Sequence, residues 1–182
     1  MIPNDMIEVY DDFLTTEEIK SLYDKLWNQD WYLNGYDSEM PNRNQPGWSF
    51  SKTISQTDSS FAFYKNYGHK ILELDLLKDK FVIHRTLTNA YKFGDVLKLH
   101  VDGGYDLTAI IYGNEFWDIN WGSETIFASS LDKNAEIIAS VIPKPGRLVI
   151  FDSKIPHSGR VPNSLFPNYR YSLVFNLSKK KI

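Results

Sequence analysis

The motif His-Val-Asp at residues 100–102 places an imidazole and a carboxylate two residues apart near the middle of the chain. β-forming residues precede and follow it, at 96–99 and 107–112, so strands are expected at both places, and a Gly-Gly pair between them indicates a turn. Side chains two residues apart in an extended chain point to the same side, so His100 and Asp102 would share one space. Together they would supply two of the three ligands of a 2-His-1-carboxylate iron site. The alternative is a histidine that caps a turn beside an aspartate that opens the Gly-Gly loop.

His157 is the candidate for the third ligand of such a site. It follows soon after the apolar run RLVIF at 147–151, which is typical of a buried strand. The chain has four histidines. We interpret His84 as a structural residue of a predicted strand and His69 as a polar residue of a predicted helix, so His157 completes the candidate set.

The last predicted strand, 169–177, carries Arg170 and Ser172 two residues apart and therefore on one face. An arginine in an apolar interior is costly unless its guanidinium meets a carboxylate, and its planar fork suits that partner better than lysine does. A bound carboxylate is one such partner, and an acidic residue of the chain is the alternative. Arg160 is the rival anchor, although its turn-like sequence favours a surface position.

The rest of the chain predicts two helices followed by many short strands. Thr15 and Glu18 form a capping box that begins an amphipathic helix over 16–27, and a second helix is expected from Ser59 or Ser60 to residue 77. Strands are expected at 6–10, 48–54, 81–91, 107–112, 125–128, 135–142, 147–151 and 169–177. This order predicts a mainly β fold with N-terminal helices (α+β), a two-sheet jelly roll with helices packed on one sheet.

Composition and length favour one domain over residues 1–182, with helical support at about 1–80 and a jelly-roll core at about 81–178. The chain is 42% hydrophobic and 15% aromatic, and its net charge of -3 gives no broad attraction to nucleic acid or anionic lipid. It has no cysteine, which excludes disulfides, thiolate zinc sites and cysteine nucleophiles. With no signal-peptide pattern and no membrane-length apolar run, we expect a soluble, cytoplasmic protein without a membrane partner.

Over roughly residues 85–177 the chain resembles the Fe(II)- and 2-oxoglutarate-dependent dioxygenases, most closely their prolyl 4-hydroxylase-like branch. The residues that carry the resemblance are Tyr91, His100-Val101-Asp102, Trp121-Gly122-Ser123-Glu124-Thr125, Pro143 to Phe151, His157 and Arg170-Tyr171-Ser172. The segment from Ile7 to Leu26 is also similar to the first strand and helix of that branch. Their order and spacing together are specific to this superfamily.

The resemblance implies a double-stranded β-helix, a cupin-like jelly roll, in which His100, Asp102 and His157 hold Fe(II). It also implies 2-oxoglutarate and O2 as co-substrates, with Arg170 paired to the distal carboxylate of 2-oxoglutarate. Four more residues are implied in this pocket: Tyr91 and Ser172 as hydrogen-bonding hydroxyls, and Thr108 and Tyr112 as inward-facing lining. The expected reaction hydroxylates an unactivated C–H bond while 2-oxoglutarate is converted to succinate and CO2.

Two features differ from the branch. Many prolyl 4-hydroxylases carry a lysine at the anchor position, where this chain offers Arg170, and this loosens the assignment to collagen-type enzymes. The usual Gly-Gly-Glu turn reads Gly-Ser-Glu at 122–124. Asp102 is present, which disfavours the halogenase variant, because that variant lacks the carboxylate.

The branch suggests a peptidyl proline as the substrate. Candidates to line a peptide groove are Trp31, Tyr32, Trp117 and Trp121. Aromatic loops would equally fit a free amino acid or a small metabolite. A nucleobase is disfavoured by the mildly acidic charge, although Arg43, Arg85 and Lys92 could contact phosphates.

Two further alternatives are open. The aromatic-bearing loop at 28–47 would be a lid or a substrate wall, or else a surface loop pinned by its aromatic residues. The rival function from another class is a non-catalytic metal-binding jelly-roll module. Such a module would have no need for an inward arginine, so Arg170 discriminates between the two functions.

Overall fold

The computed structural model describes residues 6–34 and 49–180 of the chain. Its elements, in order, are β1 (Ile7–Tyr10), α1 (Thr16–Trp27), β2 (Tyr32–Asn34), β3 (Ser49–Thr53), α2 (Phe61–Leu72), β4 (Phe81–Tyr91), β5 (Leu107–Tyr112), η1 (Ile119–Trp121), β6 (Thr125–Ala128), β7 (Ile137–Val141), β8 (Leu148–Asp152), β9 (His157–Gly159) and β10 (Arg170–Lys179). The fold is therefore mainly β with two helices, as the order of predicted elements indicated.

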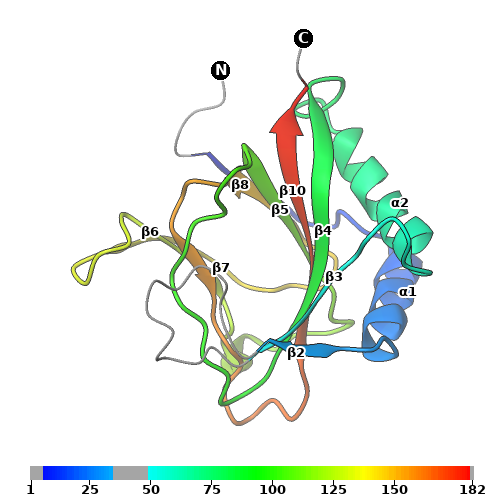
Figure 1. Cartoon of the computed structure of the whole chain (residues 1–182). Helices are drawn as coiled ribbons and strands as arrows, with labels where there is room; N and C mark the ends of the chain where they lie inside the picture. The colour runs from blue at the N-terminus through cyan, green and yellow to red at the C-terminus, as the bar shows by residue number, and fades with distance from the viewer. Residues whose placement is uncertain (1–5, 35–48, 181–182) are drawn as a thin grey trace.

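The strands form two antiparallel sheets that face each other (Figure 1). The larger sheet has seven strands in the order β1-β8-β5-β10-β4-β3-β2, and the smaller has three in the order β7-β6-β9. An isolated antiparallel bridge between His100 and His157 adds one further pairing on the free side of β9. The segment between β4 and β5 therefore crosses to the edge of the small sheet, where it pairs through His100, before the chain enters β5.

Both helices cover the outer face of the larger sheet, away from β6 and β7 (Figure 1). Alternate residues of β10 explain this layering, because successive side chains of a strand point to opposite faces. Tyr171, Leu173 and Phe175 pack in the core beneath the helices, together with Leu22 and Leu26 of α1. A second and smaller core lies between the sheets, and its buried residues are Ile110, Tyr112, Phe127, Val141, Val149, Phe151, Ile155 and Val174.

The first helix begins as its sequence predicts. The Thr15 hydroxyl accepts a hydrogen bond from the Glu18 backbone N–H at 3.3 Å, and the Glu18 carboxylate accepts one from the Thr15 N–H at 2.8 Å. The second helix is shorter than expected, ending at residue 72, and the side chain of Ser60 does not cap it. Instead, the Asp58 carboxylate accepts hydrogen bonds from the Ser60 N–H at 2.9 Å and the Ser60 hydroxyl at 2.6 Å.

One expectation about the fold is corrected. Residues 96–99 are not a strand, although the Asp102 N–H donates a backbone hydrogen bond to the Ser153 carbonyl at 2.9 Å. The first 80 residues supply strands as well as helices, because β1 pairs with β8 and β3 pairs with β4 in the larger sheet. Most of the predicted loop at 28–47 lies outside the described residues.

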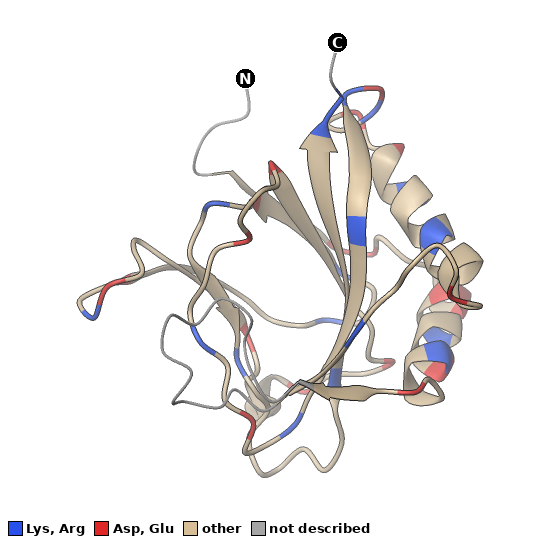
Figure 2. Ribbon diagram, in the orientation of Figure 1, with Lys and Arg blue, Asp and Glu red and all other residues tan. Residues whose placement is uncertain are grey.

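Charged residues of both signs are interspersed along the helices and loops of the described chain, without a continuous basic stripe (Figure 2). No helix among residues 6–34 and 49–180 is long and apolar enough to cross a membrane.

Candidate active site

Two histidines that are far apart in sequence are brought together by the His100–His157 bridge. The His100 N–H donates to the His157 carbonyl at 3.0 Å, and the His157 N–H donates to the His100 carbonyl at 2.8 Å. Directly paired residues of an antiparallel ladder project to the same face, and the two imidazole centroids lie 4.5 Å apart. The bridge therefore sets both rings on one side of the smaller sheet.

Asp102 completes a cluster with these two rings. Its Oδ1 lies 3.9 Å from His100 Nε2, and its Oδ2 lies 3.7 Å from His157 Nε2. One potential ligand atom from each of the three side chains lies within 4.8 Å of the others. Neither separation is short enough for a hydrogen bond, and the three groups converge as the donors of a metal site do.

Backbone contacts fix which nitrogen of each ring is free. His157 Nδ1 lies 2.9 Å from the Ile155 carbonyl, and His100 Nδ1 lies 3.0 Å from the Lys98 carbonyl. A carbonyl oxygen accepts but cannot donate, so each Nδ1 carries a proton, and in the neutral form of either ring the lone pair is at Nε2. Burial, followed by the proximity of His100, lowers the pKa of His157 to about 4. His157 is therefore neutral at pH 7, the state in which imidazole binds a metal.

Arg170 lies on the inner face at the start of β10, where it is 1% exposed. Its guanidinium carbon lies 5.4 Å from the centroid of the Tyr91 ring and 5.2 Å from that of Tyr112. Among the described residues, none of the ion pairs involves Arg170, and its Nε atom has no hydrogen-bond partner. The chain thus buries a cation without an anion beside it, which is costly unless a ligand supplies one.

The Arg170 guanidinium is a candidate anion site, and Thr125 adds a second donor to it. Its Oγ1 accepts a hydrogen bond from Arg170 Nη2 at 2.9 Å and one from the Tyr112 hydroxyl at 2.8 Å. A hydroxyl has two acceptor lone pairs and one donor, so the Thr125 proton stays available for an incoming oxygen. The guanidinium and the Thr125 hydroxyl therefore offer donors to one small region.

The anion site at Arg170 lies about two strand residues from the metal cluster, measured along β9. A Cβ built on Gly159 would meet Arg170 Nη1 at 3.2 Å, so the guanidinium lies beside that residue of β9. Gly159 follows His157 by two residues, about 7 Å along an extended strand. A five-carbon dicarboxylate has the length to reach from the metal cluster to Arg170.

The predicted pocket residues lie in two places, beside Arg170 and beside Asp102. Tyr112 and Tyr91 flank the Arg170 guanidinium, and Ser172 is buried on the same face. Thr108 lies beside the metal cluster, where its hydroxyl donates to Asp102 Oδ2 at 2.6 Å. Arg160, the rival anchor, is exposed.

Sequence reasoning missed two residues of the site. Thr125 was noted as part of a similar segment and not as a partner of Arg170. Asn176 was overlooked, although it shares the inward face of β10 with Arg170 and Ser172 by its even spacing from them. Its Nδ2 donates to Asp102 Oδ2 at 3.2 Å and to Thr108 Oγ1 at 3.1 Å.

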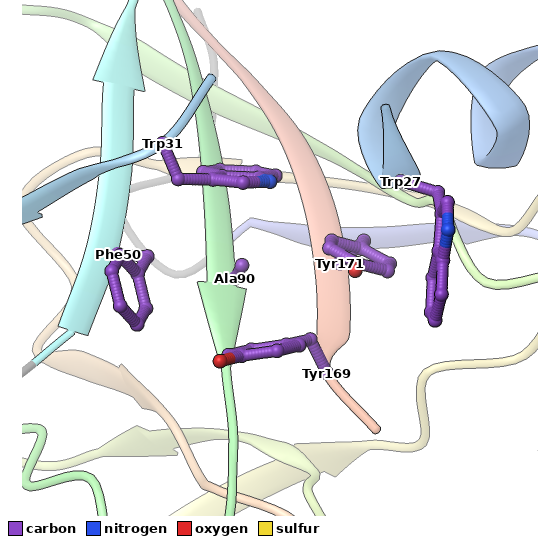
Figure 3. A pocket seen from close by; sticks show the side chains of 6 residues that line it. All are labelled: Trp27, Trp31, Phe50, Ala90, Tyr169 and Tyr171. Atoms are coloured by element: carbon purple, nitrogen blue, oxygen red, sulfur yellow. The ribbon is translucent and has the colours of Figure 1, made fainter. Parts of the chain in front are cut away.

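The predicted aromatic groove is divided between separate places. Trp31 lines a pocket of about 430 Å³ together with Trp27, Phe50, Ala90, Tyr169 and Tyr171 (Figure 3). This pocket lies on the helix-covered face of the larger sheet, because Ala90 and Tyr171 face that core and Arg170 faces away from it. Trp117 and Trp121 instead pack on Phe166, with ring centroids 4.9 Å and 4.5 Å away.

Comparison with known proteins agrees with this geometry. The sequence profile of the 2OG-Fe(II) oxygenase superfamily matches residues 86–178. The matched segment contains both histidines, Asp102 and Arg170. No curated protein matches the sequence significantly.

Solved structures of this superfamily resemble the chain closely in fold. A Pseudomonas putida prolyl-4-hydroxylase has a TM-score of 0.65 at 17% identity, and the match covers 96% of this chain and 93% of that one. A Trichoplax adhaerens prolyl hydroxylase in complex with a hypoxia-inducible-factor peptide fragment has a TM-score of 0.67 at 16% identity, covering 95% and 82%. The epimerase SnoN from nogalamycin biosynthesis has a TM-score of 0.68 at 14% identity, covering 96% and 77%.

The fold and the His-Asp-His cluster are those of a non-haem iron oxygenase. The chain belongs to the 2OG-Fe(II) oxygenase superfamily and is an enzyme that uses Fe(II), 2-oxoglutarate and O2. This excludes the non-catalytic module as its function.

Proposed function

We propose that His100, Asp102 and His157 are the iron ligands of this oxygenase and that Arg170 binds the distal carboxylate of 2-oxoglutarate. The buried guanidinium carries the proposal, because it lies about two strand residues from His157 and has no carboxylate partner among the described residues. The lone pairs at both Nε2 atoms support the assignment of the ligands.

The other residues of the pocket have defined roles in this proposal. Thr125 donates its hydroxyl proton to the same carboxylate, and Ser172 adds a second hydroxyl on that face. Tyr91 and Tyr112 stack around the guanidinium, exclude water from it and so strengthen its attraction for an anion. Iron with 2-oxoglutarate and O2 supplies the oxidising chemistry, in which 2-oxoglutarate becomes succinate and CO2 while a substrate C–H bond is hydroxylated.

The finer description of the fold is part of the same proposal. The two facing sheets form a double-stranded β-helix, a jelly roll in a single domain, with the site between the sheets. The inner core between them and the bridge at His100 support this description. The outer face of the larger sheet packs against the helices, which support β10, the strand that carries Arg170.

For the substrate, we propose a proline residue within a peptide. Two similar structures are prolyl hydroxylases from Pseudomonas putida and Trichoplax adhaerens, and the second holds a peptide fragment. Each matched pair extends over most of both chains, so the likeness includes the strands around the site.

The test is a substrate screen by mass spectrometry. Purified enzyme is supplied with Fe(II), ascorbate and 2-oxoglutarate, and with proline-containing peptides, free proline or small hydroxylatable metabolites. The proposal predicts a gain of one oxygen atom on peptidyl proline, with matching succinate, and none in Asp102→Ala. Oxidation of free amino acids or metabolites without oxidation of peptides would contradict the peptide assignment and leave the oxygenase site intact.

A further inference from the structure

Three polar residues form a network around the carboxylate of the metal cluster. Thr108 Oγ1 lies 2.6 Å from Asp102 Oδ2 and 3.0 Å from Ser153 Oγ. Asn176 Nδ2 reaches both Asp102 Oδ2 and Thr108 Oγ1. Thr108 and Asn176 occupy opposing positions of paired strands β5 and β10, so the strand register brings them together.

We propose that Thr108 and Asn176 are positioning residues that hold Asp102 Oδ2, so that Asp102 offers the metal its other oxygen, Oδ1. This inference rests on the iron site proposed above and adds two residues to it. A carboxylate held in this way binds through one oxygen and leaves a coordination position open. The proposed chemistry needs such positions for 2-oxoglutarate and O2.

The donors and acceptors of the Thr108 hydroxyl account for its direction. An ionised carboxylate can only accept, so the Thr108 proton must go to Asp102 Oδ2. The two lone pairs of the hydroxyl then accept from the Ser153 hydroxyl and from Asn176 Nδ2. The one proton and both lone pairs of the Thr108 hydroxyl are therefore in hydrogen bonds. This favours a single orientation of the hydroxyl and of the Asp102 carboxylate that it holds.

The orientation of the Asn176 amide follows from the same contacts. Turning the amide over would point its carbonyl oxygen at the Asp102 carboxylate and remove a charge-assisted hydrogen bond. Asn176 is 1% exposed, so water cannot replace that bond from outside. The side chain therefore supports Asp102 from within the core.

The other oxygen of Asp102 is the one left for a metal. Oδ2 already accepts from Thr108 and Asn176, whereas Oδ1 lies 3.9 Å from His100 Nε2, too far for a hydrogen bond, and is free to bind a metal. Mutation of a residue that orients a metal ligand typically lowers metal affinity about 10- to 100-fold. The same range is expected for this pair.

The experiment compares Mn(II) binding by wild-type protein with that of Thr108→Val and Asn176→Leu. Calorimetry measures the affinity, and water-proton relaxation of the Mn(II) complex measures the exchangeable water ligands. Thr88→Val is the matched control, because its buried hydroxyl accepts a hydrogen bond from Gln29 at 2.7 Å and faces the helices. Thermal unfolding of each metal-free protein reports any effect on folding.

We expect both test variants to bind Mn(II) about 10- to 100-fold more weakly and to hold fewer exchangeable waters, as Asp102 turns both oxygens to the metal. Thr88→Val should match the wild type in both measurements. Variants with wild-type affinity and wild-type water count would overturn the inference while the iron site stands, even if their stability falls. A wild-type protein that does not bind Mn(II) would contradict the iron site itself.

Discussion

Gly159 leaves the space that the Arg170 guanidinium occupies. A Cβ at residue 159 would lie 3.2 Å from Arg170 Nη1 and 3.2 Å from Cε2 of Tyr91, closer than most side-chain contacts in proteins. The β9 strand thus carries a metal-cluster histidine at its first residue and makes room for the anion anchor at its third. A single short strand relates the two halves of the site.

Gly159→Ala tests this relationship. The added methyl group should displace the guanidinium and weaken 2-oxoglutarate binding about tenfold, while Mn(II) affinity stays at the wild-type value. Calorimetry with each ligand in turn measures both effects. Gly103→Ala is the control, because a Cβ there meets nothing within 4 Å. Unchanged 2-oxoglutarate binding in Gly159→Ala would show that the anchor does not depend on this gap.

Replacing Arg170 separates the proposed anchor from its rival. Arg170→Ala should weaken 2-oxoglutarate binding by roughly a hundredfold, because the buried distal carboxylate loses a charged partner. Arg170→Lys should retain part of the affinity, since it keeps the charge but loses the planar fork. Arg160→Ala, at an exposed arginine, should bind 2-oxoglutarate as the wild type does. A loss in Arg160→Ala and none in Arg170→Ala would reverse the assignment.

Asp58 predicts a pH dependence of stability remote from the site. Hydrogen bonds from the Ser60 side chain and backbone, with Lys52 at 3.0 Å, lower the pKa of Asp58 to about 2 from 3.8. Because its pKa is depressed in the folded state, Asp58 stabilises the fold fully above pH 3.8 and loses this contribution as the pH falls through about 2.

Asp58→Asn should therefore destabilise the protein by about 1 kcal/mol at pH 6, after allowance for solvent screening. The difference from the wild type should shrink as the pH is lowered towards 2. Urea unfolding at several pH values measures it, with Asp75→Asn, at an exposed aspartate, as the control. A difference that does not change with pH would show that the ionised carboxylate is not the stabilising group.

Several residues of the site could be predicted because their positions follow from neighbouring residues in the sequence, such as the alternation of side chains along a strand. The alternation of β10 puts Arg170 and Ser172 on one face, and the structure agrees. His157 was identified because it follows a buried strand, although its pairing with His100 depends on contacts between distant segments. Such a pairing leaves no periodic pattern in the sequence.

The missed residues show where local rules end. Asn176 lies among Val174, Phe175 and Leu177, where a polar residue could equally have faced a turn or solvent. Its role appears once the register opposes it to Thr108. Residues 96–99 have strand-like composition but no neighbour to pair with, so propensity alone gave the wrong element. Trp31 was placed near the substrate by its aromatic character, and the sheet puts it on the opposite face.

The most direct test of the account is anaerobic titration of wild-type protein with Fe(II) and 2-oxoglutarate, followed by visible absorption. Chelation of 2-oxoglutarate on the iron should produce a weak metal-to-ligand charge-transfer band in the wild type. The band should require higher 2-oxoglutarate in Arg170→Ala and be disrupted in Asp102→Ala, with both variants folded. Folded wild-type protein that binds iron but shows no band would contradict the proposed site.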